Sequence, residues 1–577
     1  MILKIRVRGG GRVVLDRELG NPAGSTPAMV PVGVELSPSP QGLEEEYGTL
    51  FTPASLLFLH QLVTEFDNEV DQVLQLRVSR KAHLDASGDL PAFSRATSHI
   101  RDDPSWTVLP VPPRLQRRHV DVGDMAPCDT ERLLHALRSP AQGLQIDFDD
   151  GNCPTFYNQI KGISNVCKVV HNQFPDIPAL PQVPVLMLRP RAWNMVEHNM
   201  LVNGREVPGP LFDFGLLMFH CGKALYNSES GPFFYLSKVE SFMEARLWNN
   251  IFLWAQHQLQ LPRGSIKATV LIENVLATFE MEEILYELRE HSAGLNCGIW
   301  DYSASFVNKF GHRGDFLLPD RSKYVNMEKR FLRSYMDLLV QTCHRRGALA
   351  TGGMAAPLLP PARDSPAHRT VLANVTRLKL LEIQAGVDGF MVYDLRLIEP
   401  MQKLFQQHTG GENQLHRVRE DVTVTPEDLL CMPAGGVTLH GLQYNIGVGI
   451  LFIHAWLSGK GHFFYRGQVE DSATAEISRS QVWQWILHQA RLEDSQRVVS
   501  RSLVVQLTQE VMKELTEVTA CQTVRAAERL QTAAEMFLEV VLKRDFPEFL
   551  TSYLNLDHTF LSSQREEEAS VALLSKL

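Results

Sequence analysis

Two acids, Glu273 and Asp301, each end a short apolar segment and could together bind a metal ion. Residues 268–272 form an apolar, β-branched run of the kind that is buried in a parallel sheet, and Glu273 follows it directly. Residues 276–288 have the apolar spacing of a helix, and residues 295–300 predict a second strand, which Asp301 closes. Because a strand–helix–strand unit sets its strands parallel, both carboxylates should lie at the end of the sheet where α/β proteins bind ligands.

Carboxylate oxygens that converge on one point suit Mg²⁺, which keeps its remaining positions for water or substrate oxygens. Each acid could instead cap the helix that follows it, a common role of Asp and Glu at such turns. The spacing of the two acids leaves both interpretations open.

Three more polar residues lie where they could serve the same site. Residues 143–151 end a candidate strand in acids that include Asp149, and this acid could also be a helix cap. Residues 185–188 predict a buried strand that leads into Arg189, whose guanidinium could form a structural ion pair or stabilise a carboxylate or an enolate oxygen. Asp471 precedes a helix and could simply be its cap. Each of the three therefore has a structural alternative to a role in catalysis.

The composition is typical of a soluble globular enzyme, with 44% hydrophobic and 21% charged residues. A net charge of −10 argues against a nucleic-acid-binding protein, which normally needs a basic face. The best apolar run, residues 448–457, is far shorter than the roughly 18 residues of a membrane span. The eight cysteines include no CxxC pair, and we interpret them as reduced thiols. We therefore expect neither nucleic acid nor a membrane as a partner.

Residues 289–302, REHSAGLNCGIWDY, resemble the signature of the malate synthases, and the similarity extends from about residue 47 to about residue 556. The resemblance implies an α/β fold, a (β/α)8 TIM barrel with an N-terminal helical clasp and a C-terminal helical plug. Strands that alternate with helices from about residue 130 to about residue 425 agree with a barrel. The expected parts are an N-terminal extension or linker (1–40), the clasp (41–128), the barrel (129–428), the plug (429–572) and a targeting tail (573–577).

The same resemblance implies an acyltransferase that converts the acyl group to alkyl on transfer. Its reaction would be the Mg²⁺-dependent Claisen condensation of glyoxylate with acetyl-CoA, followed by thioester hydrolysis to malate and CoA, as in the glyoxylate cycle. The family would place Mg²⁺ on Glu273 and Asp301, with Asp149 near the metal through water. Asp471 would remove a proton from the acetyl methyl group while Arg189 stabilises the enolate oxygen. The backbone N–H groups expected to hold the substrate carboxylate are those of Gly298, Ile299, Trp300 and Asp301.

Departures from the family pattern leave alternatives open. Ser303 and Ala304 stand where the family usually has two larger apolar residues, and Tyr393 lies where it has a His-Pro-Gly type of turn. Gly447 replaces a frequent Arg, and Asp149 replaces a Glu. The chain could therefore be a related barrel enzyme that condenses another acyl-CoA with another 2-oxo acid, or a non-catalytic peroxisomal homologue.

Both ends of the chain carry signals of their own. Residues 1–15 are expected to pair as a small hairpin around residues 9–11, and the rest of the first 40 residues to form a linker. The last three residues, Ser575, Lys576 and Leu577, match the address that the peroxisomal import receptor reads from a free C-terminus. We therefore expect the protein in the peroxisomal matrix.

Overall fold

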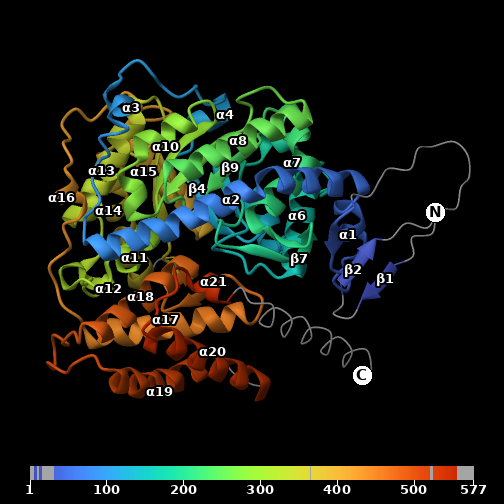
Figure 1. The fold of residues 1–577 in the computed structure, drawn as a ribbon. Helices are drawn as coiled ribbons and strands as arrows, with labels where there is room; N and C mark the ends of the chain where they lie inside the picture. Colours follow the sequence, from blue (N-terminus) through green and yellow to red (C-terminus); the bar gives the residue numbers. More distant parts are fainter. Residues whose placement is uncertain (1–4, 9–11, 16–31, 364, 520–523, 555–577) are drawn as a thin grey trace, which may run out of the picture.

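The computed structural model describes residues 5–8, 12–15, 32–363, 365–519 and 524–554. Its centre is a closed barrel of eight parallel strands (Figure 1). In order around the barrel the strands are β10 (Lys267–Ile272), β11 (Ser292–Cys297), β12 (Ala350–Ala355), β13 (Gly389–Val392), β4 (Val120–Met125), β5 (Gly143–Asp147), β6 (Val185–Arg189) and β9 (Phe233–Leu236). The predicted (β/α)8 barrel is therefore confirmed.

Helices cover the outside of the barrel. β5, β6, β10 and β11 are buried along their whole length, as expected for strands whose side chains pack both inside the barrel and against helices. The longer helices of this layer are α5 (Thr130–Leu137), α6 (Phe156–Val170), α7 (Gly209–Asn227), α8 (Phe242–Leu259), α10 (Met281–Glu287), α13 (Arg330–Arg345), α14 (Pro366–Ala385) and α15 (Ile398–Thr409). Shorter ones are α9 (Val275–Thr278), α12 (Arg321–Tyr324) and α16 (Pro426–Leu429). Most apolar residues of the strands and helices form one hydrophobic cluster, and residues of β6, β9, β10 and β11 contribute to a smaller separate one.

The strand–helix–strand unit that begins with β10 differs from its prediction at its second strand. β10 and β11 pair in parallel, as predicted. β11 ends before the predicted boundary, however, so Asp301 lies in the first turn of α11 (Ile299–Phe310) and not at a strand end. The prediction is wrong because Gly294, expected to break the preceding helix, lies inside β11, where a Cβ atom would come within 1.9 Å of Leu349 O.

A long N-terminal helix lies against the barrel helices. This helix, α2 (Pro53–Ser87), begins with a proline after the Thr52 cap and packs against α7 and α8 (Figure 1). Arg77 Nε and Glu244 Oε1, 2.7 Å apart and both buried, join α2 to α8. Three short helices complete this region: α1 (Glu44–Leu50), α3 (Ser98–Asp102) and α4 (Pro113–Gln116).

A separate antiparallel sheet joins the N-terminus to an insertion in the barrel. Its strands, in order, are β1 (Ile5–Arg8), β2 (Arg12–Leu15), β3 (Val34–Leu36), β7 (Val196–Val202) and β8 (Arg205–Pro208). The expected hairpin is confirmed by the pairing of β1 with β2. The linker prediction is wrong for β3, because Val34 and Leu36 are buried where this strand pairs with β7.

The start of the barrel is also corrected. β4 belongs to the closed barrel although it precedes residue 129, so the barrel includes residues that the sequence prediction assigns to the clasp. Asp121, Gly123 and Asp124 interrupt the apolar pattern of this strand, which is why periodicity does not reveal it.

The C-terminal helices form a second hydrophobic cluster beside the barrel (Figure 1). They are α17 (Leu439–Trp456), α18 (Ser472–Leu487), α19 (Arg501–Val518), α20 (Val524–Leu542) and α21 (Leu550–Leu554), with a hairpin of β14 (Phe463–Tyr465) and β15 (Gln468–Glu470). α18 connects the two clusters, because it packs on α17 and also on α11 of the barrel. The predicted helical domain after the barrel is therefore confirmed. Among the described helices, none is both long and apolar enough to cross a bilayer. Ser575, Lys576 and Leu577 lie outside the described residues.

Candidate active site and metal site

Three buried acids from two sides of the barrel converge on one point. Asp150, Glu273 and Asp301 each offer a carboxylate oxygen, and these oxygens all lie within 4.8 Å of one another. Asp150 lies in the loop after β5, Glu273 follows β10, and Asp301 lies in the first turn of α11. The structure thus brings together Glu273 and Asp301, the two acids that the sequence singles out, and adds Asp150.

This acidic cluster has the chemistry of a cation site. Both carboxylate oxygens of Asp301 are buried and have no hydrogen-bond partner among the described residues. An uncompensated buried carboxylate is strongly destabilising, and hard oxygen ligands are those that Mg²⁺ prefers. The residues present therefore fit a divalent cation.

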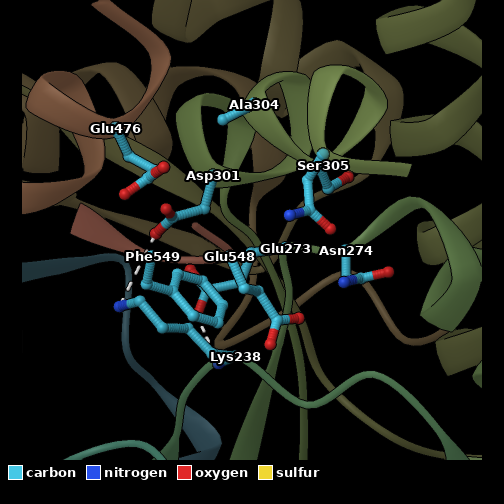
Figure 2. Close-up of a pocket in the computed structure, with 10 residues that line it drawn as sticks. Lys238, Glu273, Asn274, Asp301, Ala304, Ser305, Glu476, Glu548 and Phe549 are labelled. Carbon is cyan, nitrogen blue, oxygen red and sulfur yellow. Dashed lines mark hydrogen bonds and ion pairs between the residues drawn. The ribbon is translucent and has the colours of Figure 1, made fainter. Parts of the chain in front are cut away.

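Two basic side chains border the acids. Lys238 Nζ lies 2.7 Å from Asp149 Oδ2 and 2.7 Å from Asp150 Oδ1. It also lies 3.8 Å from Asp301 Oδ2 (Figure 2). The Arg189 guanidinium contacts Asp150 and lies 3.3 Å from Asp149 Oδ2. Asp149 thus bonds to Lys238 and Arg189, and its Oδ1 accepts a hydrogen bond from the Ala192 N–H at 3.1 Å. Unlike Asp149, Asp150 also belongs to the set of three converging acids.

Burial and these charges shift the carboxyl groups in different directions. Burial raises the pKa of Asp301 well above its usual value, and Lys238 only partly offsets this effect. Burial also raises the pKa of Glu273, against the opposing effect of Lys238 and Arg189. For Asp150, burial is outweighed by Arg189 and Lys238, which lower its pKa below the usual value. A bound cation would favour the ionised form of all three.

Asp471 reaches the barrel mouth from the C-terminal domain. It is the N-cap of α18: its Oδ1 accepts a hydrogen bond from Thr474 N–H at 3.1 Å, and Thr474 Oγ1 accepts one from the Asp471 N–H at 3.0 Å. The next residue, Ser472, donates a hydrogen bond to Asp150. The capping role expected as an alternative is therefore present, and it places Asp471 beside the acidic cluster.

A further acid, Asp124 near the end of β4, faces Asp471. The carboxyl groups of the two residues interact electrostatically, and both residues are buried. Burial, followed by the charge of Asp124, raises the pKa of Asp471 well above its usual value, and burial raises the pKa of Asp124 to about 7. Asp124 has a positive φ of 49°, which is uncommon for a residue other than glycine and clusters at functional sites.

The start of α11 supplies backbone N–H donors. The N–H groups of Ile299, Trp300 and Asp301 precede the first bond of the helix, which Tyr302 N–H donates to Gly298 O at 3.0 Å. The Gly298 N–H, expected to bind a substrate carboxylate, instead donates to Tyr335 Oη at 2.9 Å. In this structure a buried tyrosine therefore already bonds this amide.

Glu273 and Asp301 line a small cavity of about 20 Å³ that the C-terminal domain helps to close. The side chains around it are those of Lys238, Glu273, Asn274, Asp301, Ala304, Ser305, Asn308, Glu476, Glu548 and Phe549. Figure 2 shows Glu548 and Phe549, which precede α21, close to Glu273 and Lys238. A bound molecule would thus be enclosed by both domains.

The departures from the family pattern have structural explanations in two cases. A Cβ atom on Gly447 would come within 2.8 Å of Tyr465 Oη, so this position does not accept an Arg without rearrangement. The Tyr393 hydroxyl hydrogen-bonds to His462 Nε2 at 3.0 Å, which joins the end of β13 to the segment before β14. Ser303 and Ala304 are buried in α11 and affect its packing.

Sequence reasoning missed Asp150, Lys238 and Asp124 as parts of this site. Asp150 is adjacent to the predicted Asp149, and a run of acids after a strand was the only signal for it. The positions of Lys238 and Asp124 depend on which loops meet at the barrel mouth, and local pattern does not encode this.

Comparison with known proteins gives one family. A family model described as "Malate synthase, TIM barrel domain" matches residues 185–432, and one described as "Malate synthase, C-terminal" matches residues 436–557. A malate synthase of Myxococcus xanthus is 41% identical over 513 residues, which are 88% of this chain and 93% of that protein. A glyoxysomal malate synthase of Cucumis sativus is 37% identical over 550 residues, which are 92% of this chain and 95% of that protein.

Solved structures give a weaker match. The "Haloferax volcanii Malate Synthase Magnesium/Glyoxylate Complex" has a TM-score of 0.41 and 14% identity, covering 73% of this chain and 99% of that chain. A similarity of this size supports no conclusion about the site.

Proposed function

The chain belongs to the malate synthase family, and from its site we propose that it condenses glyoxylate with acetyl-CoA and hydrolyses the thioester to give malate and CoA. The observation that carries the mechanism is the position of Asp471 beside the converging oxygens of Asp150, Glu273 and Asp301. Asp471 could thus move a proton while the three converging acids hold a cation that binds the glyoxylate aldehyde.

Asp150, Glu273 and Asp301 would hold Mg²⁺, which would act as a Lewis acid on the aldehyde of glyoxylate. The N–H groups in the first turn of α11 suit the carboxylate of that substrate, because they combine donors with the positive end of a helix. Asp149 would act through Lys238 and Arg189, to which it is bonded.

Asp471 would remove a proton from the acetyl methyl group. A base for this weakly acidic proton needs a raised pKa, and burial together with Asp124 gives Asp471 one. Arg189 would stabilise the enolate oxygen that forms. Its Nε–H is buried without a partner among the described residues, so one donor of its guanidinium is not used by the acids.

The C-terminal domain would exclude water while the carbon–carbon bond forms. Glu476 and Phe549 come from this domain and line the same cavity as Glu273 and Asp301. Movement of the domain would then admit the water that hydrolyses the thioester.

We also propose a peroxisomal location and recognition of Ser575, Lys576 and Leu577 by the import receptor. Relatives from Cucumis sativus and Candida tropicalis are named glyoxysomal, while the Myxococcus xanthus relative is bacterial. The location of a fluorescent fusion at the N-terminus tests this proposal. Deletion of Leu577 should release the fusion into the cytosol, and a cytosolic full-length fusion would refute it.

The release of free thiol from acetyl-CoA in the presence of glyoxylate and Mg²⁺ tests the activity. We expect release that requires both glyoxylate and the metal. A panel of other 2-oxo acids and acyl-CoA molecules tests the alternative substrates, and a lack of turnover with every pair would favour a non-catalytic homologue.

A further inference from the structure

A buried tyrosine joins the two chain segments that carry Glu273 and Asp301. Tyr335 lies on α13 and is completely buried. Its hydroxyl donates a hydrogen bond to Ile272 O and accepts one from Gly298 N–H at 2.9 Å. One side chain thus bonds both the residue before Glu273 and the N-cap residue of α11.

These bonds continue the sheet beyond its last strand pair. β10 and β11 stay in register to the pair Ile272–Cys297, where β10 ends and the chain turns toward Glu273. Past this point α11 begins, and direct bonds between the strands can no longer hold the two segments together. The Tyr335 hydroxyl acts as a bridge at this position.

The bridge is held rigidly. The Tyr335 ring stacks on the Tyr302 ring, with centroids 4.1 Å apart and planes at 7°. Tyr302 follows Asp301 in α11, so this contact also fixes the helix turn that carries the acid. Gly298 lies close to Glu273: a Cβ atom there would come within 2.9 Å of both Glu273 Cβ and Oε2. A small shift between the segments would therefore change the separation of the two carboxylates.

We infer that Tyr335 is a positioning residue that sets the separation of Glu273 and Asp301 and thereby the affinity of the site for a divalent cation. This inference rests on the proposed metal site and goes beyond it, because Tyr335 would touch neither the metal nor a substrate. Loss of the Tyr335 hydroxyl would leave Ile272 O and the Gly298 N–H without this partner, next to Glu273 and the start of α11.

Tyr335→Phe tests the inference, because it keeps the ring and its stacking and removes the bridge. We expect the dissociation constant for Mg²⁺, measured by calorimetry on the full-length protein, to rise about tenfold or more. In turnover assays, the Mg²⁺ concentration for half-maximal rate should rise more than kcat falls at saturating Mg²⁺. Tyr47→Phe is the matched control, since it removes a hydroxyl bond to a backbone carbonyl, Ser37 O at 2.9 Å, away from the site.

A loss of thermal stability in Tyr335→Phe with an unchanged Mg²⁺ dissociation constant would overturn the inference and leave only a structural role. If Tyr335→Phe does not fold, Tyr302→Leu, which removes the stacking support but keeps the bridge, should weaken Mg²⁺ binding in a folded protein, and unchanged binding there would overturn the inference. If the native protein itself does not bind Mg²⁺, the proposed metal site fails. If the native protein and Tyr335→Phe bind Mg²⁺ equally well, the proposed metal site stands and only the role of Tyr335 is refuted.

Discussion

Glu273 and Asp301 present carboxylate oxygens within 4.8 Å of each other, although one follows a strand and the other lies on a helix. Parallel pairing of β10 with β11 brings the two segments to the same end of the barrel. Asp150 completes the set from the other side of the mouth, next to Ser472 of the C-terminal domain. The three converging acids thus come from the barrel, and the C-terminal domain adds Ser472 and Asp471 beside them.

Asp471→Asn should abolish catalysis and keep the fold. Asparagine accepts the capping hydrogen bond of Thr474 N–H as well as aspartate does, but it cannot take up a methyl proton. We expect kcat for thiol release to fall by about 10² to 10⁴, with the thermal unfolding midpoint little changed. Full activity in this variant would show that another group is the base.

Asp150→Asn and Asp149→Asn should differ in their effect on metal binding. Both acids are bonded to Lys238 and Arg189, but only Asp150 offers an oxygen to the converging set. We expect the Mg²⁺ dissociation constant to rise by about 100-fold or more in the Asp150 variant and by about tenfold in the Asp149 variant. The reverse order in calorimetry would make Asp149 the ligand.

Asp124→Asn should shift the pH dependence of turnover. The charge of Asp124 raises the pKa of Asp471, so a neutral amide in its place should lower that pKa. The acidic limb of the kcat/KM profile should then move to lower pH, because Asp471 stays ionised further into acid. Asp85→Asn on α2 controls for the loss of one charge far from the site, and an acidic limb that stays in place in Asp124→Asn would exclude the coupling.

His291 should make the fold sensitive to acid. It is buried between Gln256 and Asn249, and burial lowers its pKa from 6.5 to about 4. Between these two pKa values His291 is protonated in the unfolded chain but neutral in the native state. The free energy of unfolding therefore decreases as pH falls from about 6.5 to about 4. This shift corresponds to roughly 3 kcal/mol of unfolding free energy.

His291→Gln keeps a hydrogen-bonding side chain and removes the titration. Chemical denaturation at several pH values should therefore show a smaller loss of unfolding free energy in this variant between pH 6.5 and 4 than in the native protein. Equal losses in the two proteins would show that other groups cause the acid sensitivity.

Much of this architecture follows from local sequence. The apolar runs of β6 and β10 and the signature around Asp301 predict parallel strands that deliver polar groups to one end of a barrel. β4 escapes prediction because two acids break its apolar pattern: Asp121, which bonds to Arg118, and Asp124, which interacts with Asp471. The end of β11 is mispredicted because Gly294 lies inside the strand, where the Leu349 backbone leaves no room for a Cβ atom. Local sequence does not reveal this contact.

The composition of the site is less predictable than its location. Asp149 and Asp150 are neighbours in the chain, and only the course of the loop after β5 decides which one joins Glu273. Tyr335 occupies an ordinary apolar position of a helix, and its hydroxyl gains a role only where α13 meets the ends of β10 and β11. Such contacts between distant segments depend on the folded structure.

The central claim is that Glu273 and Asp301, with Asp150, hold one divalent cation beside Asp471. A crystal grown with Mn²⁺ in place of Mg²⁺ tests it most directly, through the anomalous diffraction of the metal. We predict one strong peak within about 2.0–2.4 Å of oxygens of Glu273 and Asp301. A peak elsewhere in the barrel, or no peak between these two carboxylates at saturating Mn²⁺, would contradict the account.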